Sequence, residues 1–190
     1  MATHSQLIIE PIADEATLRS GATEADLAFV ETFTAESRRC EVLAWRAIVR
    51  RVLGEGVEIF YDDYGAPKAT NPSKYISISH SREYVSVLIS EQLCAVDIED
   101  AGRDFRKVAT RYLSAEEQYM AERYDVFAEM WSAKEALYKY YKKGKLDLVR
   151  DISIESYNSE KSTFVATILG GEPIVVDIKR YNNLVVATID

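Results

Sequence analysis

Two carboxylates one residue apart, Asp97 and Glu99, follow the apolar pair Ala95-Val96. On a β-strand, side chains at i and i+2 share a face, with Cα atoms roughly 6.8 Å apart. Such carboxylates repel each other unless a cation lies between them, and Mg²⁺ suits the arrangement because it combines a few carboxylates with waters and substrate phosphates. The spacing indicates a Mg²⁺ site. The exposed end of a strand that runs into Asp100 would give the same pattern.

A second candidate is the segment Trp131-Ser132-Ala133-Lys134-Glu135-Ala136-Leu137-Tyr138-Lys139. In a helix, Trp131, Glu135 and Lys139 recur every four residues and share one stripe. A solvated Glu–Lys pair has the same spacing, but a large apolar ring on that stripe indicates partial burial. A carboxylate beside lysines on a semi-buried stripe suits a metal–pyrophosphate site, in which the lysines take the phosphate charge.

The third candidate is Ile76-Ser77-Ile78-Ser79-His80-Ser81. Its alternation buries the two isoleucines and brings the last three residues to the end of a strand. Hydroxyls, an imidazole and backbone N–H groups at a turn can hold a phosphate, although Ser-His-Ser is also common turn material. A Ser-His-Asp triad stays open as well, but the G-x-S-x-G elbow that would favour it is absent.

The elements that must position these residues alternate between helices and strands. Helices are predicted over 14–31, from an N-cap at Thr34 to Leu53, over 103–111, from a capping box at Ser114, and over 127–143. Strands are predicted at 7–11, 57–61, 75–79, 84–90, 94–98, 152–156, 164–169, 174–179 and 184–189, and a polar loop at 62–73. The fold class is therefore α+β.

The two halves of the chain share a pattern. Phe33-Thr34-Ala35-Glu36-Ser37 is similar to Leu113-Ser114-Ala115-Glu116-Glu117, and each segment is followed by a tryptophan that opens a basic amphipathic run. This weak internal repeat predicts two α+β halves related by pseudo-symmetry. Chance similarity between two amphipathic helices is the alternative.

Charge and composition exclude several classes. The net charge of −8 argues against broad affinity for nucleic acid or anionic membranes. Basic residues concentrate in 38–51 and 134–145, which indicates a localised anionic ligand or a solvated helix face. No apolar run approaches the ~20 residues of a membrane span, and the first residues lack the features of a secretory signal. We expect a cytoplasmic protein with no membrane or nucleic-acid partner, in which Cys40 and Cys94 are free thiols.

Taken together and in this order, the motifs resemble those of the 4′-phosphopantetheinyl transferase superfamily, in particular its longer monomeric type associated with surfactin synthetase. The strand end at 77–81 is similar to (N/S)-x-S-H-(S/T), and 95–99 is similar to G-(V/I)-D-(V/I)-E. Residues 112–117 resemble the F-x-x-x-E segment, and 131–136 match W-(S/A)-x-K-E-(A/S) with Lys139 at the expected distance. Tyr64-Gly65-Ala66-Pro67 resembles the Y-G-K-P loop more faintly, so the resemblance spans residues 64–139.

The resemblance implies two similar α+β halves, 1–92 and 93–190, with coenzyme A in the cleft between them. It implies Mg²⁺ ligands at Asp97, Glu99 and Glu135, contacts to the 3′-phosphate of coenzyme A from Ser79 and His80, and contacts to the pyrophosphate from Lys134 and Lys139. Two residues depart from the family pattern. Ala95 replaces a glycine, and Ala66 replaces the loop lysine, for which Lys68 can compensate. We add Arg39 and Arg46 as phosphate contacts from their place in the first basic run.

The implied reaction moves the phosphopantetheine arm of coenzyme A onto a serine of an apo acyl or peptidyl carrier protein and releases 3′,5′-ADP. Carrier proteins of this class are acidic around that serine, and belong to fatty-acid, polyketide or peptide synthesis. Glu135 is the first candidate for the base that takes the serine proton, Glu117 the second, and a metal-bound water a further alternative.

Two other functions stay open. A Mg²⁺-dependent phosphodiesterase or nuclease uses carboxylates and lysine in a similar way, but the acidic net charge disfavours long polynucleotide substrates. The other alternative is an inactive module that binds coenzyme A or a carrier protein. The intact Asp97, Glu99, Glu135 and Lys139 argue against such a loss of activity.

Overall fold

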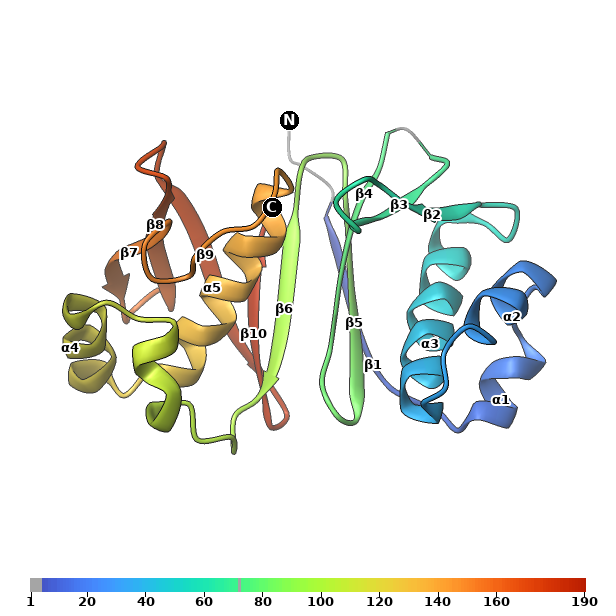
Figure 1. Cartoon of the computed structure of the whole chain (residues 1–190), viewed down its shortest axis with the longest axis horizontal. Coiled ribbons are helices and arrows are strands. Elements are labelled where there is room, and N and C mark those ends of the chain that lie inside the picture. Colours follow the sequence, from blue (N-terminus) through green and yellow to red (C-terminus); the bar gives the residue numbers. More distant parts are fainter. Residues whose placement is uncertain (1–4, 72) are drawn as a thin grey trace. The chain divides into compact units, whose positions relative to one another are not determined.

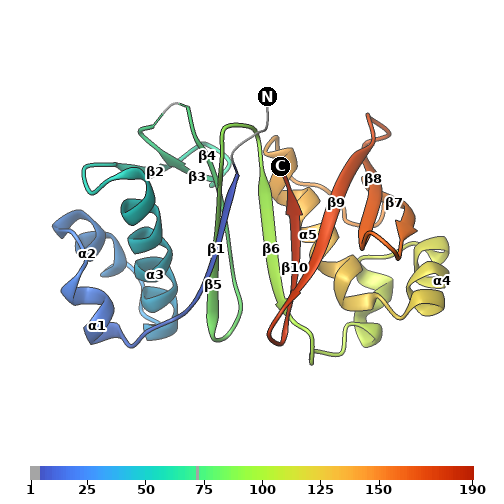
Figure 2. The same ribbon diagram turned by 180° about the vertical axis from the view of Figure 1, so that it is seen from behind.

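The computed structural model describes residues 5–71 and 73–190. The chain divides into two compact units, Met1–Gln92 and Leu93–Asp190. Each unit combines helices with antiparallel sheet (Figures 1 and 2), so the α+β class is confirmed. The predicted pseudo-symmetry of the two halves, and the cofactor cleft that it implies, stay predictions.

The first unit places one long helix, α3, against a three-stranded sheet. Its elements are β1 (Gln6–Pro11), α1 (Glu15–Ser20), α2 (Glu24–Val30), α3 (Glu36–Leu53), β2 (Ile59–Tyr61), β3 (Pro67–Ala69), β4 (Tyr75–His80) and β5 (Tyr84–Ser90). The sheet has the order β1-β5-β4, and β2 and β3 form a separate hairpin. α3 buries Val42, Trp45 and Val49 at the spacing of an amphipathic helix.

The second unit lays α5 across a five-stranded antiparallel sheet. Its elements are β6 (Ala95–Asp100), the 3₁₀ helix η1 (Arg106–Arg111), α4 (Ala115–Tyr124), α5 (Phe127–Tyr141), β7 (Ile152–Asn158), β8 (Thr163–Ile168), β9 (Ile174–Tyr181) and β10 (Leu184–Ile189). The strand order is β6-β10-β9-β8-β7. Met130, Ala133 and Leu137 of α5 pack into one core with Ala95 of β6 and Val185 of β10.

Alternation along β6 decides where the acidic pair points. Ala95 belongs to the core under α5, and Asp97 and Glu99 share its face of the strand. The pair therefore faces helix α5, and Asp97 is buried. The alternative of an exposed strand end does not apply.

Several predicted boundaries need correction. Residues 14–31 form two short helices, and of the predicted helix at 103–111 only Arg106–Arg111 is helical, as the 3₁₀ helix η1. The N-cap of α3 is Ala35, without a side-chain hydrogen bond, and not Thr34. The polar loop at 62–73 contains β3. The capping box at Ser114 and Glu117 is confirmed.

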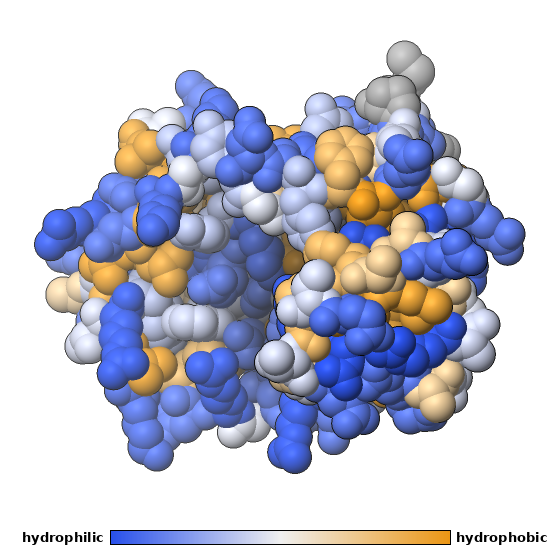
Figure 3. Space-filling model, turned by 45° about the vertical axis from the view of Figure 1, so that its right-hand side comes forward, coloured by the Kyte–Doolittle hydropathy of each residue, from blue (hydrophilic) through white to orange (hydrophobic). Residues whose placement is uncertain are grey.

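The surface in Figure 3 is mostly hydrophilic, with smaller hydrophobic patches. No helix among the described residues is long and apolar enough to cross a membrane. Both cysteines are buried free thiols, as expected from the sequence.

Candidate functional site

Helix α5 contacts Asp97 of the β6 pair with two of its residues and Glu99 with a third. Ser132 Oγ donates to Asp97 Oδ2 at 2.7 Å, and Lys139 Nζ donates to Asp97 Oδ1 at 2.7 Å and to the Val96 carbonyl at 3.1 Å. The indole Nε1 of Trp131 donates to Glu99 Oε1 at 2.8 Å. The sequence did not single out Ser132 for this contact. Its position directly after the tryptophan is the signal that could have revealed it.

Glu135 of α5 adds a third carboxylate to this group. Among the described residues it makes no hydrogen bond or ion pair, and burial together with the charge of Asp97 raises its pKa. The pKa of Glu99 is also raised, by burial first and then by the charge of Asp97. Burial is the larger cause of each raised pKa, and repulsion between neighbouring carboxylates adds to it. Carboxylate oxygens are the donors that Mg²⁺ prefers, and an ion between these three would relieve that repulsion. Their oxygens do not all lie within 4.8 Å of one another, so they would have to move closer together to bind it.

Lys134 and Glu117 lie apart from this group, in a buried ion pair. Lys134 Nζ is 2.6 Å from Glu117 Oε1 and donates to the carbonyls of Leu148 at 2.8 Å and Ile152 at 2.6 Å. Its side chain has no exposed surface, and burial lowers its pKa. The expected contact of Lys134 with a pyrophosphate does not fit this burial, because all three donor positions of its ammonium group are used inside the protein.

A family model described as the 4′-phosphopantetheinyl transferase superfamily matches residues 93–188, which is half of the chain and nearly all of the second unit. The chain belongs to this superfamily. Its members transfer phosphopantetheine to carrier proteins, typically with coenzyme A and Mg²⁺, so membership implies these partners here. The match does not distinguish subtypes of the superfamily. A comparison with curated proteins found no match for the chain.

The first unit carries the residues that the superfamily resemblance assigns to the 3′-phosphate. Ser79 is buried on β4, and His80 is exposed at the end of that strand. His80 Nε2 lies 3.3 Å from a guanidinium nitrogen of Arg38 and 3.4 Å from Glu41 Oε2, both on α3. Sequence reasoning missed Arg38 as a neighbour of His80, because the two residues are 42 positions apart.

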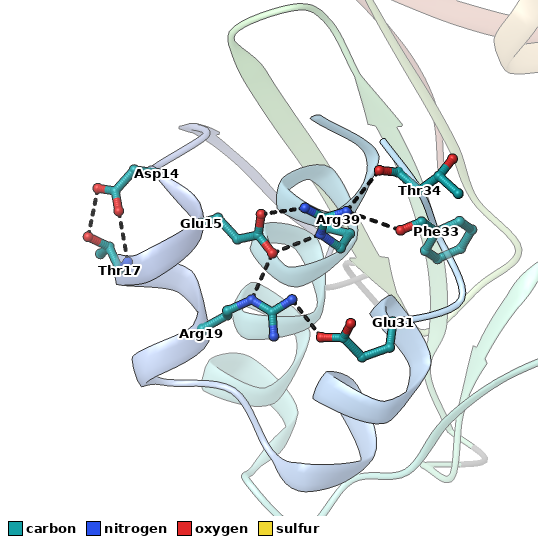
Figure 4. Close-up of polar contacts among 8 residues, drawn as sticks. All are labelled: Asp14, Glu15, Thr17, Arg19, Glu31, Phe33, Thr34 and Arg39. Atoms are coloured by element: carbon teal, nitrogen blue, oxygen red, sulfur yellow. Dashed lines mark hydrogen bonds and ion pairs between the residues drawn. The ribbon is translucent and has the colours of Figure 1, made fainter. Parts of the chain in front are cut away.

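The two arginines proposed from the basic run are part of the packing of the first unit. Arg39 donates from Nε and one terminal nitrogen to Glu15 and from the other to the carbonyls of Phe33 and Thr34 (Figure 4). Arg46 pairs with buried Asp26 at 2.6 Å and lies 4.4 Å from the centre of the Phe29 ring. Both arginines thus have partners inside the first unit, although Asp26 also pairs with Arg50 and the Nε of Arg46 is buried without an acceptor.

Lys68, the proposed substitute for the missing loop lysine, is half-buried on β3. Its Nζ lies 3.6 Å from Asp62 Oδ2 and 5.9 Å from the centre of the Tyr75 ring. The ion pair with Asp62 is long, so little has to be broken before Lys68 contacts another anion.

Proposed function

We propose that this protein transfers the 4′-phosphopantetheine group from coenzyme A to a serine of an apo carrier protein, in a Mg²⁺-dependent reaction that releases 3′,5′-ADP. The observation that carries the proposal is the group of carboxylates formed by Asp97 and Glu99 of β6 with Glu135 of α5, next to the ammonium of Lys139. A cytoplasmic, monomeric enzyme of the longer type is part of the same proposal.

Asp97, Glu99 and Glu135 would hold the Mg²⁺ ion. When bound, Mg²⁺ offsets charge on the diphosphate of coenzyme A and on the leaving 3′,5′-ADP. Lys139 fixes Asp97 by an ion pair of 2.7 Å and adds a positive charge beside the carboxylates. This charge would favour the leaving phosphate as its negative charge grows.

The serine oxygen forms a bond to the β-phosphorus, the bond from that phosphorus to the bridging oxygen breaks, and the electron pair leaves with 3′,5′-ADP. Glu135 is the proposed base for the serine proton, directly or through a water. Its oxygens accept no hydrogen bond among the described residues, so their lone pairs stay available. Glu117 is the weaker candidate, because Lys134 and the backbone N–H groups of Ser114 and Ile154 already occupy its carboxylate.

Ser79 and His80 are the proposed contacts for the 3′-phosphate of coenzyme A. His80 lies at an exposed strand end beside the guanidinium of Arg38, which can donate hydrogen bonds to a phosphate. Glu41 contacts both groups, so a phosphate bound here would have to replace that carboxylate. Lys68 is proposed as a further phosphate contact in place of Ala66.

The deciding experiment is an incubation of the protein with coenzyme A, Mg²⁺ and apo carriers of fatty-acid, polyketide and peptide-synthetase type, followed by mass spectrometry. One carrier gains the mass of phosphopantetheine, and neither the Glu135→Gln variant nor an EDTA-treated sample modifies it. Free phosphopantetheine without carrier modification would instead identify a phosphodiesterase. Coenzyme A binding without any product would identify an inactive binding module.

A further inference from the structure

One more cation lies next to the carboxylate group, on the loop that follows β6. A guanidinium nitrogen of Arg103 is 3.4 Å from Glu99 Oε2, and the Arg103 side chain is 56% exposed. Lys139, the cation on Asp97, is only 28% exposed and has a contact of 2.7 Å. Arg103 is therefore the more loosely held of the two positive charges beside the carboxylates.

Two aromatic rings lie beside the guanidinium of Arg103. Its Cζ is 4.8 Å from the centre of the Phe105 ring and 5.7 Å from that of Trp131. These two rings are stacked with their centres 5.5 Å apart. Trp131 also donates its indole N–H to Glu99 Oε1. One tryptophan thus supports both Glu99 and the cation beside it.

The loop backbone is held as well. Asp100 Oδ1 accepts from the Gly102 N–H at 2.8 Å and from the Asn183 side-chain amide at 2.6 Å. The Arg103 N–H donates to the Asp100 carbonyl at 3.1 Å. A held loop and a weak terminal contact mean that the guanidinium can exchange its partner while its backbone stays in place.

The charge of the carboxylate group indicates which new partner the guanidinium of Arg103 would take in place of Glu99. Three carboxylates and two cations leave one net negative charge, so a divalent cation among them makes the group positive. Arg103 then no longer serves as a counter-ion for Glu99. A guanidinium offers paired N–H donors that match a phosphate, and it stays charged at any working pH.

On the basis of the proposed function, we infer that Arg103 is a substrate-binding residue. It neutralises Glu99 in the metal-free protein and contacts the diphosphate of coenzyme A when metal and substrate are bound. Such a residue has opposite effects on the two ligands, because it repels a metal ion and attracts a phosphate.

The test compares Arg103→Gln with Arg106→Gln. Arg106 is a matched control, because it is also about half exposed, pairs with carboxylates (Glu122 and Asp125) and lies 4.6 Å from the centre of the Phe127 ring. Both variants remove one positive charge. Mn²⁺ binding without coenzyme A is measured by electron paramagnetic resonance, and coenzyme A binding at saturating Mg²⁺ by calorimetry.

In Arg103→Gln, Mn²⁺ binds about fivefold more tightly, as expected when one exposed charge is removed. Coenzyme A binds about tenfold more weakly, as expected for one lost charge-assisted hydrogen bond. Arg106→Gln changes both affinities less than about twofold. Arg103→Lys, which keeps the charge but not the planar donors, restores the parent Mn²⁺ affinity and only part of the coenzyme A affinity.

A loss of both affinities in Arg103→Gln would show that Arg103 only orders the loop, and equal behaviour of the two glutamine variants would remove it from the site. Either result overturns the inference and leaves the proposed function intact. A parent protein that binds neither Mn²⁺ nor coenzyme A would overturn the proposed function itself.

Discussion

Asp97 and Glu135, two proposed ligands of one metal, differ in how their charges are compensated. Asp97 accepts hydrogen bonds from Ser132 and Lys139, both at 2.7 Å. Glu135 accepts none among the described residues, and its raised pKa reflects burial and repulsion from Asp97. Without metal, Asp97 therefore stabilises the fold, whereas the charge of Glu135 destabilises it.

Glu135→Gln and Asp97→Ala should separate these two effects. Both variants lose transfer activity by at least about a hundredfold, because each removes a proposed metal ligand. In EDTA, Glu135→Gln melts at the parent temperature or above it. Asp97→Ala loses about 1–3 kcal/mol of unfolding free energy, since Lys139 and Ser132 lose their acceptor. Transfer within a few fold of the parent in either variant would show that the metal assignment is wrong.

The spacing of residues in the sequence brings the three carboxylates onto facing sides of a strand and a helix, but it did not reveal that Lys134 is buried. The strand β6 and the helix α5 are present, so the i+2 rule puts Asp97 and Glu99 on one face of β6, and the i+4 rule puts Glu135 on the stripe of Trp131. The role of these residues as metal ligands stays a prediction. Lys134 follows Ala133 and precedes Leu137, both fully buried in the core. Its position on that apolar stripe is a signal for burial. The partner that makes burial tolerable, Glu117, is known only from the tertiary structure.

Between elements, the buried pair of Lys134 and Glu117 joins α5, α4 and β7. Lys134 donates to the carbonyl of Ile152 at 2.6 Å, where β7 begins. Glu117 accepts from the N–H of Ser114, which caps α4, and from the N–H of Ile154 in β7 at 2.7 Å each. Loss of one charge leaves the other buried without a counter-ion.

Lys134→Met should therefore act on stability rather than on substrate binding. The expected loss in unfolding free energy is about 3–5 kcal/mol, as for other buried pairs that lose one partner. Adding Glu117→Gln to Lys134→Met restores part of it, because the uncompensated charge disappears. Urea unfolding measures both values. A variant with parent stability and a raised KM for coenzyme A would return Lys134 to the role of a phosphate contact.

A second buried network joins α2 and α3 in the first unit. Asp26 of α2 accepts from Arg46 at 2.6 Å and from Nε of Arg50 at 2.7 Å. Burial alone would raise the pKa of Asp26, but the hydrogen bonds from Arg50 and Arg46 outweigh it and lower the pKa to about 2.

This network makes the stability of the protein depend on acid pH. The folded-state pKa of Asp26 lies below its unfolded value of 3.8, so its contribution is present above about pH 4 and is lost as pH falls toward 2. The contribution is about 2 kcal/mol. Urea unfolding of Asp26→Asn at pH 6 and pH 3 should show a smaller pH dependence than the parent. Asp63→Asn, at an exposed position, is the control. If Asp26→Asn kept the pH dependence of the parent, Asp26 would not be the source of the stability that is lost in acid.

Regular periodicity explains which elements the sequence could predict. The last four strands and α5 have clear patterns, and the structure contains all of them. β3 has only three residues and begins with a proline, so it lacks an alternating pattern. The region 14–31 breaks into two helices at Gly21, where the sequence suggested only helical periodicity. The pairing of β2 with β3 depends on contacts across the hairpin that a local pattern does not encode.

At the scale of the whole molecule, charge is distributed unevenly. The net charge is −8, yet the C-terminal end of α5 continues into Lys142, Lys143 and Lys145. Lys142 ends the helix in a left-handed conformation with φ 49°, and its side chain is partly buried. Lys143 and Lys145 are exposed. Positive charge at a helix C-terminus is favourable because it interacts with the helix dipole. Lys143 and Lys145 are the lysines at this end of α5 whose side chains a partner protein can contact.

An acidic carrier protein, as the superfamily resemblance implies, would dock on this positive end of an otherwise acidic enzyme. The test is the double variant Lys143→Glu/Lys145→Glu, which leaves the half-buried Lys142 in place. Lys107→Glu/Lys161→Glu reverses two exposed lysines elsewhere in the same unit and gives the same net charge. Initial rates are measured against carrier concentration at several salt concentrations.

Charges at the edge of an interface act mainly on association, and salt screens them with a Debye length of about 8 Å at physiological ionic strength. The double variant at 143 and 145 should therefore raise the KM for the carrier about tenfold at low salt and flatten its dependence on salt. The control variant shares the change in net charge, so it shows how much of this effect comes from long-range repulsion alone.

The KM for coenzyme A stays within about twofold in both variants, because none of the four lysines belongs to the proposed nucleotide contacts. An unchanged carrier KM and salt response would move docking to another surface, with the basic helix α3 as the next candidate. A rise in the KM for coenzyme A alone would instead mean that these lysines bind the nucleotide.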